Sequence, residues 1–128
     1  MAEGPSPRLG RLTRRQDFLA AAKGRRFHTE RMSVQGRPRE EGGLRVGLTV
    51  TKRVGHATER NRIKRRLRAA LAASGAAHLE RPADVVVIAR RECLGAGFPL
   101  LVEELGRALT KVTRPGEGGE RRRGRAAD

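Results

Sequence analysis

Alternation of apolar and polar residues predicts one strand in the middle of the chain. Over residues 44–51, every second residue is a branched aliphatic: Leu44, Val46, Leu48 and Val50. This period of two is typical of a strand with one buried face. The other face carries small or polar residues, among them Gly47, Thr49 and Thr51. We expect that face to line a shallow groove.

Two further apolar patterns predict a buried strand and a final helix. The run Val85–Ala89 is uninterrupted and mostly β-branched, which is typical of a central strand buried on both faces. Asp84, which opens it, is interpreted as an ordinary strand-end residue. Arg31–Gln35 is a weaker strand candidate. Near the end of the chain, apolar residues recur at helical spacing: Leu101, Leu105, Ala108, Leu109 and Val112. Pro99 suits the first turn of that helix.

The first helix is expected from Arg14 to Lys23, ending at Gly24. Thr13-Arg14-Arg15-Gln16 has the pattern of a capping box at its start. Leu19 is its expected core anchor. The adjacent Phe18 differs from Leu19 by about 100° in direction and so points elsewhere, into a groove or into another part of the core.

A strongly basic helix is predicted from Thr58 onward, with Thr58 as its N-cap. Its apolar stripe has helical spacing: Ile63, Leu67, Ala70 and Leu71. Asn61, Arg65 and Arg68 fall on the opposite face, with Lys64 on its flank. Arg62 and Arg66 point to a third side.

Charge in this region indicates a phosphate-bearing partner. Residues 52–68 carry eight positive side chains and one carboxylate, Glu59. Arg60 and Arg62 lie in the first helical turn, where the helix dipole disfavours cations. Phosphate would turn these repulsions into attractions. The alternative is a solvated basic face, but such faces usually mix the two signs of charge.

Composition points the same way. The 128 residues carry a formal net charge of +15, with a sequence pI of about 11.8, as in many nucleic-acid-binding proteins. Three Phe are the only aromatic residues, which argues against a sheet that stacks several bases. Arginines outnumber lysines by 25 to 4, and Arg can clamp phosphate and stack on bases.

Other classes of protein are not favoured by the sequence. A lone Cys93 forms no internal disulfide and fits a reducing cytoplasm. The three His show no metal-ligand spacing, so no metal site is expected. No apolar run has the length of a membrane span, and Met1–Gly10 lacks the apolar core of a signal peptide.

The predicted order is helix, strand, strand, helix, strand, helix. This order favours an α+β fold built as a two-layer α/β sandwich. We expect residues 1–10 to be a disordered N-terminal segment, residues 11–112 to form one RNA-binding domain, and residues 113–128 to be a disordered basic tail.

The basic helix resembles that of the protein component of bacterial ribonuclease P. That family carries the motif Arg-Asn-x-x-Lys-Arg-x-x-Arg, which is complete here at residues 60–68. The preceding residues 45–57, with their strand and glycine turn, are also similar, as are Asp17-Phe18 and the strand at 84–90. The resemblance covers roughly residues 8–112.

The resemblance implies a mixed sheet with a left-handed crossover through the basic helix, a ribosomal protein S5 domain 2-like fold and an exception to the usual hand. It also implies the protein subunit of a ribonucleoprotein endonuclease that removes the 5′ leader of precursor tRNA. In this family the RNA subunit, with bound magnesium, performs the hydrolysis. The implied partners are that catalytic RNA and precursor tRNA, with no DNA and no membrane, in the cytoplasm.

Site residues carried over from the resemblance form two sets. The expected RNA-binding residues are Lys52, Arg53, Arg60, Asn61, Arg62, Lys64, Arg65 and Arg68. The expected leader-binding cleft contains Phe18, Arg14, Arg15, Thr49 and Thr51. Ala22 and Gln35 stand where the family often has aromatic residues, so leader stacking is expected to be weaker, or Arg side chains to replace it.

Three other functions can be weighed against this one. A structural ribosomal RNA-binding protein would also be small and basic, and composition does not separate the two; the complete Arg-Asn motif after a glycine turn favours ribonuclease P. A free-standing nuclease would need catalytic residues, and no paired carboxylates or His-nucleophile pair are found. A helix-turn-helix DNA binder is disfavoured because a strand precedes the basic helix.

Overall fold

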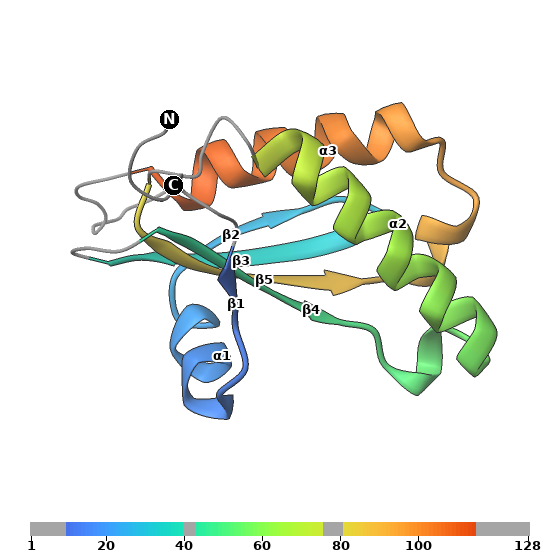
Figure 1. The fold of residues 1–128 in the computed structure, drawn as a ribbon, viewed down its shortest axis with the longest axis horizontal. Coiled ribbons are helices and arrows are strands. Elements are labelled where there is room, and N and C mark those ends of the chain that lie inside the picture. The colour runs from blue at the N-terminus through green and yellow to red at the C-terminus, as the bar shows by residue number, and fades with distance from the viewer. Residues whose placement is uncertain (1–9, 40–42, 76–80, 115–128) are drawn as a thin grey trace, which may run out of the picture.

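A five-stranded mixed sheet forms the centre of the fold (Figure 1). The structure, a computed structural model, describes residues 10–39, 43–75 and 81–114. The strands are β1 (Gly10–Arg11), β2 (Arg25–His28), β3 (Met32–Pro38), β4 (Leu44–Thr49) and β5 (Ala83–Ala89), in the order β1-β4-β5-β3-β2. β4 pairs in parallel with both β1 and β5, whereas β3 is antiparallel to β5 and β2.

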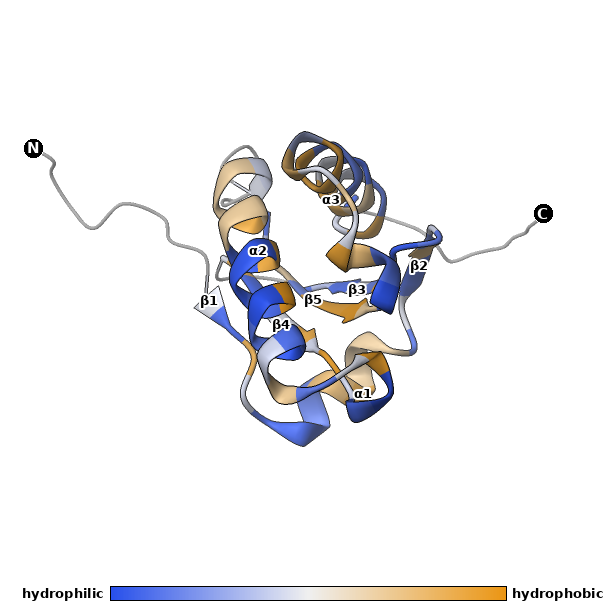
Figure 2. Cartoon of the chain, turned by 90° about the vertical axis from the view of Figure 1, so that its right-hand side faces the viewer, coloured by the Kyte–Doolittle hydropathy of each residue, from blue (hydrophilic) through white to orange (hydrophobic). Residues whose placement is uncertain are grey.

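Helices cover both faces of this sheet (Figures 1 and 2). They are α1 (Arg15–Ala21), α2 (Ala57–Gly75) and α3 (Phe98–Val112), with short 3-10 turns η1 (Lys52–Val54) and η3 (Arg91–Leu94). α2 and α3 pack on one face and make the expected sandwich, while α1 lies on part of the other face. The predicted α+β fold is confirmed. The parallel neighbours β4 and β5 are joined through α2, so the crossover is present; its left hand stays a prediction.

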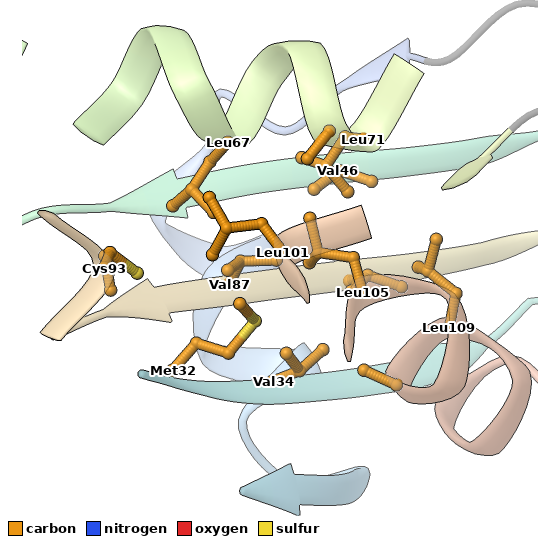
Figure 3. Packing of buried hydrophobic residues seen from close by; sticks show 14 of the residues in the cluster. Met32, Val34, Val46, Leu67, Leu71, Val87, Cys93, Leu101, Leu105 and Leu109 are labelled. Carbon is orange, nitrogen blue, oxygen red and sulfur yellow. The ribbon is translucent and has the colours of Figure 1, made fainter. Parts of the chain in front are cut away.

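The main core lies between the sheet and the pair α2 and α3 (Figure 3). In α2 and α3, every apolar residue that the helical spacing predicted as a core contact is buried: Ile63, Leu67, Ala70, Leu71, Leu101, Leu105, Ala108, Leu109 and Val112. β5 is central, as its β-branched run indicated. Val85 and Val87 enter this main core, and Val86 faces the other way.

A smaller cluster holds α1 on the opposite face. Ala21 and Leu12 are buried there with Val86, and the ring of Phe18 packs against them, partly buried. Leu19 is 54% exposed, so its prediction as the core anchor of this helix was wrong. The reason is that α1 has only seven residues, which is too short for a periodic stripe to rank two adjacent apolar residues.

The predicted helix caps also differ from the structure. α1 begins after Arg14, with no side-chain cap, so Thr13 does not form the expected capping box. α2 begins at Ala57, one residue before Thr58, and the carboxylate of Glu59 accepts a hydrogen bond from the backbone N–H of His56. The helix start is therefore capped by an acidic residue at its third position.

The strands β1 and β2 were not predicted. β1 has only two residues and is defined by pairing with β4, while β2 is a charged edge strand in which Phe27 alternates with basic neighbours. Gly10 pairs with Arg45, and Thr113 is buried, so the described domain extends slightly beyond residues 11–112. The expected disorder of residues 1–9 and 115–128 lies outside the described residues. None of the described helices is long and apolar enough to cross a membrane.

Candidate RNA-binding surface

The basic face of α2 is turned away from the core. Asn61, Arg65 and Arg68 are exposed, and Lys64 on their flank is partly buried. Figure 2 shows the N-terminal half of α2 as hydrophilic and its C-terminal half as more apolar. The helix therefore presents cations and an amide along one exposed side, as its spacing predicted. Such a side can bind phosphate groups and donate hydrogen bonds to them.

The remaining residues of the predicted RNA-binding set surround the start of α2. Lys52 and Arg53 are exposed in η1, and Arg62 is exposed on the helix. Arg60 is partly buried, and its Nε donates to the carbonyl oxygen of Gly55 at 3.3 Å, so part of its donor capacity serves the turn.

Arg66 belongs to the basic run but is turned inward. Its Nη1 donates to the carbonyl oxygens of Cys93 and Leu94 at 3.0 and 3.2 Å, and its Nη2 donates to Ala96. These carbonyls end η3 and lead into α3. Arg66 therefore joins α2 to the segment that follows β5, which agrees with its placement away from the motif face.

A groove brings α1, the edge of the sheet and α2 together. It has a volume of about 330 Å³ and is lined by Gly10, Arg11, Leu12, Phe18, Val46, Gly47, Leu48, Lys64, Arg68 and Leu71. The ring of Phe18 lies directly over Gly47: a Cβ at Gly47 would be 2.5 Å from Cζ of that ring. Phe18 is thus both a member of the small cluster and a wall of the groove, and the two interpretations left open by the sequence both apply.

Only part of the predicted leader-binding set lines this groove. Arg14 and Arg15 are exposed at the start of α1, Thr49 is partly buried at the end of β4, and Thr51 is exposed beyond it. None of these four is among the groove residues. Instead, Phe18 shares the groove with Lys64 and Arg68, which the sequence assigned to a different RNA partner.

The two positions that depart from the family pattern lie near α1. Ala22 follows α1 and is partly buried. Gln35 is paired with Arg26 and Val86 in the sheet, and Val86 contacts the small cluster under α1. Alternation along β3 therefore places Gln35 on the α1 side of the sheet, where it offers an amide in place of an aromatic ring.

A buried carboxylate ties the sheet to α1, and the sequence did not reveal it. Asp84 is 6% exposed and accepts two hydrogen bonds of 2.8 Å from Arg45, whose guanidinium also lies 3.6 Å from Asp17 on α1. Arg39 makes a further ion pair with Asp84. These hydrogen bonds raise the pKa of the Arg45 guanidinium. Asp84 is thus the centre of a charged network, and its interpretation as an ordinary strand-end residue missed that role.

Side chains that could hold a metal ion do not gather in the described parts of the chain. No group of three or more His, Cys, Asp or Glu comes together there. Cys93 is buried, its Sγ lies 3.0 Å from the carbonyl oxygen of Arg31, and burial raises the pKa of its thiol. It is therefore a structural residue.

Comparison with known proteins identifies the family. A family model described as Ribonuclease P matches residues 7–113. The chain belongs to the ribonuclease P protein family. Among relatives described as Ribonuclease P protein component, that of Brucella melitensis biotype 1 is 39% identical over 121 residues, which cover 88% of this chain and 86% of the relative. That of Ruegeria pomeroyi is 44% identical over 109 residues, with 81% and 86% covered.

Solved structures of ribonuclease P proteins share the fold. The protein from Staphylococcus aureus superposes with a TM-score of 0.68 at 26% identity, covering 84% of this chain and all of the other. The protein from Thermotoga maritima has a TM-score of 0.66 at 28% identity, covering 84% and 98%. The Arg-Asn motif at residues 60–68 lies on α2, and its Asn61, Arg65 and Arg68 are exposed.

Proposed function

We propose that this chain is the protein subunit of a ribonuclease P, which binds the catalytic RNA subunit and the 5′ leader of precursor tRNA and so supports endonucleolytic 5′ maturation of tRNA. Family membership gives the class of enzyme. The observation that carries the proposal for this chain is the geometry of α2. Its apolar stripe is buried to the last residue, and Asn61, Arg65 and Arg68 are left exposed on the other side.

The groove supports the second part of the proposal. Phe18 offers an aromatic surface on which a base can stack, and Lys64 and Arg68 at the same groove can neutralise phosphate. A single-stranded leader exposes both its bases and its phosphates, whereas a duplex hides its bases. The ribosomal alternative is less favoured, because it does not account for the family match over residues 7–113.

Catalysis in this proposal belongs to the RNA subunit. Magnesium would be held mainly by that RNA, since the described side chains provide no cluster of metal ligands. Magnesium would then stabilise the attacking and leaving oxygens of the hydrolysis. The protein would supply binding energy and orientation. We also propose a cytoplasmic location for this reaction.

Reconstitution tests the proposal. The purified chain, the ribonuclease P RNA of the same organism and a labelled precursor tRNA are mixed in magnesium buffer at physiological salt. We expect cleavage at the mature 5′ end with both subunits and none with the protein alone. Cleavage by the RNA-free protein, or failure of the protein to bind that RNA while it binds ribosomal RNA, would overturn the assignment.

Three variants test the motif face within the same assay. Changing Asn61, Arg65 or Arg68 to Ala should weaken RNA binding by roughly 1–3 kcal/mol each, the range for charge-assisted hydrogen bonds. Each Arg change should also reduce the log–log salt slope by about 0.7–0.9. Arg62→Ala, exposed on another side of α2, is the control and should have a smaller effect. Equal losses of affinity at all four positions would mean that RNA binding depends on overall positive charge and not on one oriented face of α2.

A further inference from the structure

The carboxylate of Glu59 connects three segments at the start of α2. It accepts a hydrogen bond of 2.9 Å from the backbone N–H of His56. It also pairs with Arg91 through two contacts of 3.2 and 3.3 Å. The same guanidinium donates to the carbonyl oxygen of Val54 at 2.8 Å. Arg91 is 32 residues from Glu59 and opens η3, so the pair joins the segment after β5 to the turn before α2.

Close packing around Gly55 shows how tightly this turn is held. A Cβ on Gly55 would overlap Oε1 of Glu59 and would lie 2.9 Å from Nη1 of Arg91. The carboxylate and the guanidinium therefore rest against the backbone at Gly55, and any side chain there would force them apart. Hydrogen bonds to Glu59 from His56 and Arg91 lower the pKa of its carboxylic acid.

A helix cap alone does not account for this arrangement. Capping requires the bond from His56 to Glu59 and no partner from another segment. The position is also unfavourable for a protein that binds RNA through this region, because a carboxylate repels phosphate. Glu59 is the only acidic residue among residues 52–68. A function in orienting the surrounding cations would offset that repulsion.

We propose that Glu59 and Arg91 are positioning residues for the RNA-binding helix. Their ion pair fixes the turn at Gly55 and the first turn of α2, so that Lys52 and Arg53 in η1 and the motif face of α2 meet RNA in one relative orientation. This inference rests on the proposed function. It goes beyond that function because it assigns a necessary role to an acidic residue and to a segment outside the motif.

The competing interpretation, in which only charge governs RNA binding, predicts the opposite change in affinity for one substitution. If charge alone governs binding, Glu59→Ala removes a repulsive group and should tighten RNA binding. If the pair positions the helix, Glu59→Ala should weaken binding of the RNA subunit by about fivefold or more, an effect typical of coupled neighbours. Glu103→Ala is the matched control. Glu103 is an exposed acid on α3 that pairs with Arg107 at 3.3 Å, and its loss changes the net charge equally.

A double-mutant cycle then separates positioning from direct contact by Arg91. Arg91→Ala weakens binding in either case, because the side chain is also 59% exposed. As a positioning residue, however, Arg91 should matter much less in the Glu59→Ala background. If Arg91 instead contacted RNA directly, Arg91→Ala would reduce the affinity by the same factor in both backgrounds.

Binding is measured with the intact chain and the ribonuclease P RNA, at a temperature where melting curves show every variant folded. Glu59→Gln, which keeps an acceptor for the His56 N–H, replaces Glu59→Ala if that variant does not fold, and it too should bind more weakly than Glu103→Ala. Glu59 variants that bind as tightly as Glu103→Ala, or additive losses in the cycle, would overturn the inference. Failure of the wild-type chain to bind this RNA would instead refute the proposed function.

Discussion

Substitution of Gly47 by Ala tests the contact that joins α1 to the groove. The added Cβ would lie 2.5 and 2.6 Å from two ring carbons of Phe18 and 3.1 Å from Cβ of Leu12. Carbon atoms in ordinary contact are about 3.5–4.0 Å apart, so the ring must move by roughly 1 Å. Overpacking of this kind costs about 1–3 kcal/mol in a tight core. Phe18 is only partly buried and can shift toward solvent, so we expect about 1–2 kcal/mol.

Two measurements follow from this displacement. The melting temperature should fall by roughly 4–8 °C for a domain of this size. Affinity for a precursor tRNA with a leader should fall about fivefold, the lower end of the range for one base–aromatic stack, while affinity for mature tRNA should be unchanged. Gly95→Ala is the control for stability, since a Cβ there meets no atom within 4 Å.

The Phe18→Ala background isolates the cause. Without the ring, Gly47→Ala should lose most of its effect on stability, because Leu12 would then be the nearest neighbour. Equal destabilisation in both backgrounds would mean that the strain arises in the β4 backbone. If Gly47→Ala changed neither the melting temperature nor the affinity for a precursor tRNA with a leader, the contact between Gly47 and Phe18 would be refuted.

Two more predictions concern α3. Hydrogen bonds from Arg31 lower the pKa of buried Glu104, so the stability that its carboxylate contributes is fully present above the ordinary Glu pKa and is lost as the pH falls through the lowered pKa. Glu104→Gln should therefore lower the melting temperature most at neutral pH and progressively less below about pH 5; a difference that does not vary with pH would contradict this. Gly106 lies inside α3, where a Cβ would make only an ordinary contact of 3.9 Å with Ser74. Gly106→Ala should raise the stability by about 0.4–1 kcal/mol in denaturant titrations, and a loss of stability would show a conflict with α2.

The sequence by itself determined those helices and strands in which a regular apolar pattern extends over many residues. The stripes of α2 and α3 bury every residue that their spacing predicted, and the β-branched run of β5 buries all of its residues except Ile88, which is partly buried. A helix with one buried face, or a strand with both faces buried, places its apolar residues at a fixed spacing, so the residues of that segment alone reveal the burial. The exposed side of α2, and with it the candidate RNA-binding face, follows from the same pattern.

Short or edge elements were decided by the tertiary structure. In the two turns of α1, the close approach of Gly47 on β4 selected Phe18 as the partly buried residue and left Leu19 exposed. β1 exists only through its pairing with β4, and β2 is an edge strand with charged side chains. The spacing of residues within a segment does not indicate which distant segment it will pair with.

Long-range polar contacts were also outside the reach of sequence spacing. Helical spacing placed Arg66 and Arg68 on different sides of α2 but could not show what each contacts: Arg66 donates to carbonyls 27 to 30 residues away, while Arg68 lines the groove. Asp84 meets Arg45 because β4 and β5 pair in one register. A charged side chain can face water, a carbonyl or an opposite charge, and only the folded arrangement of distant segments decides which of these it reaches.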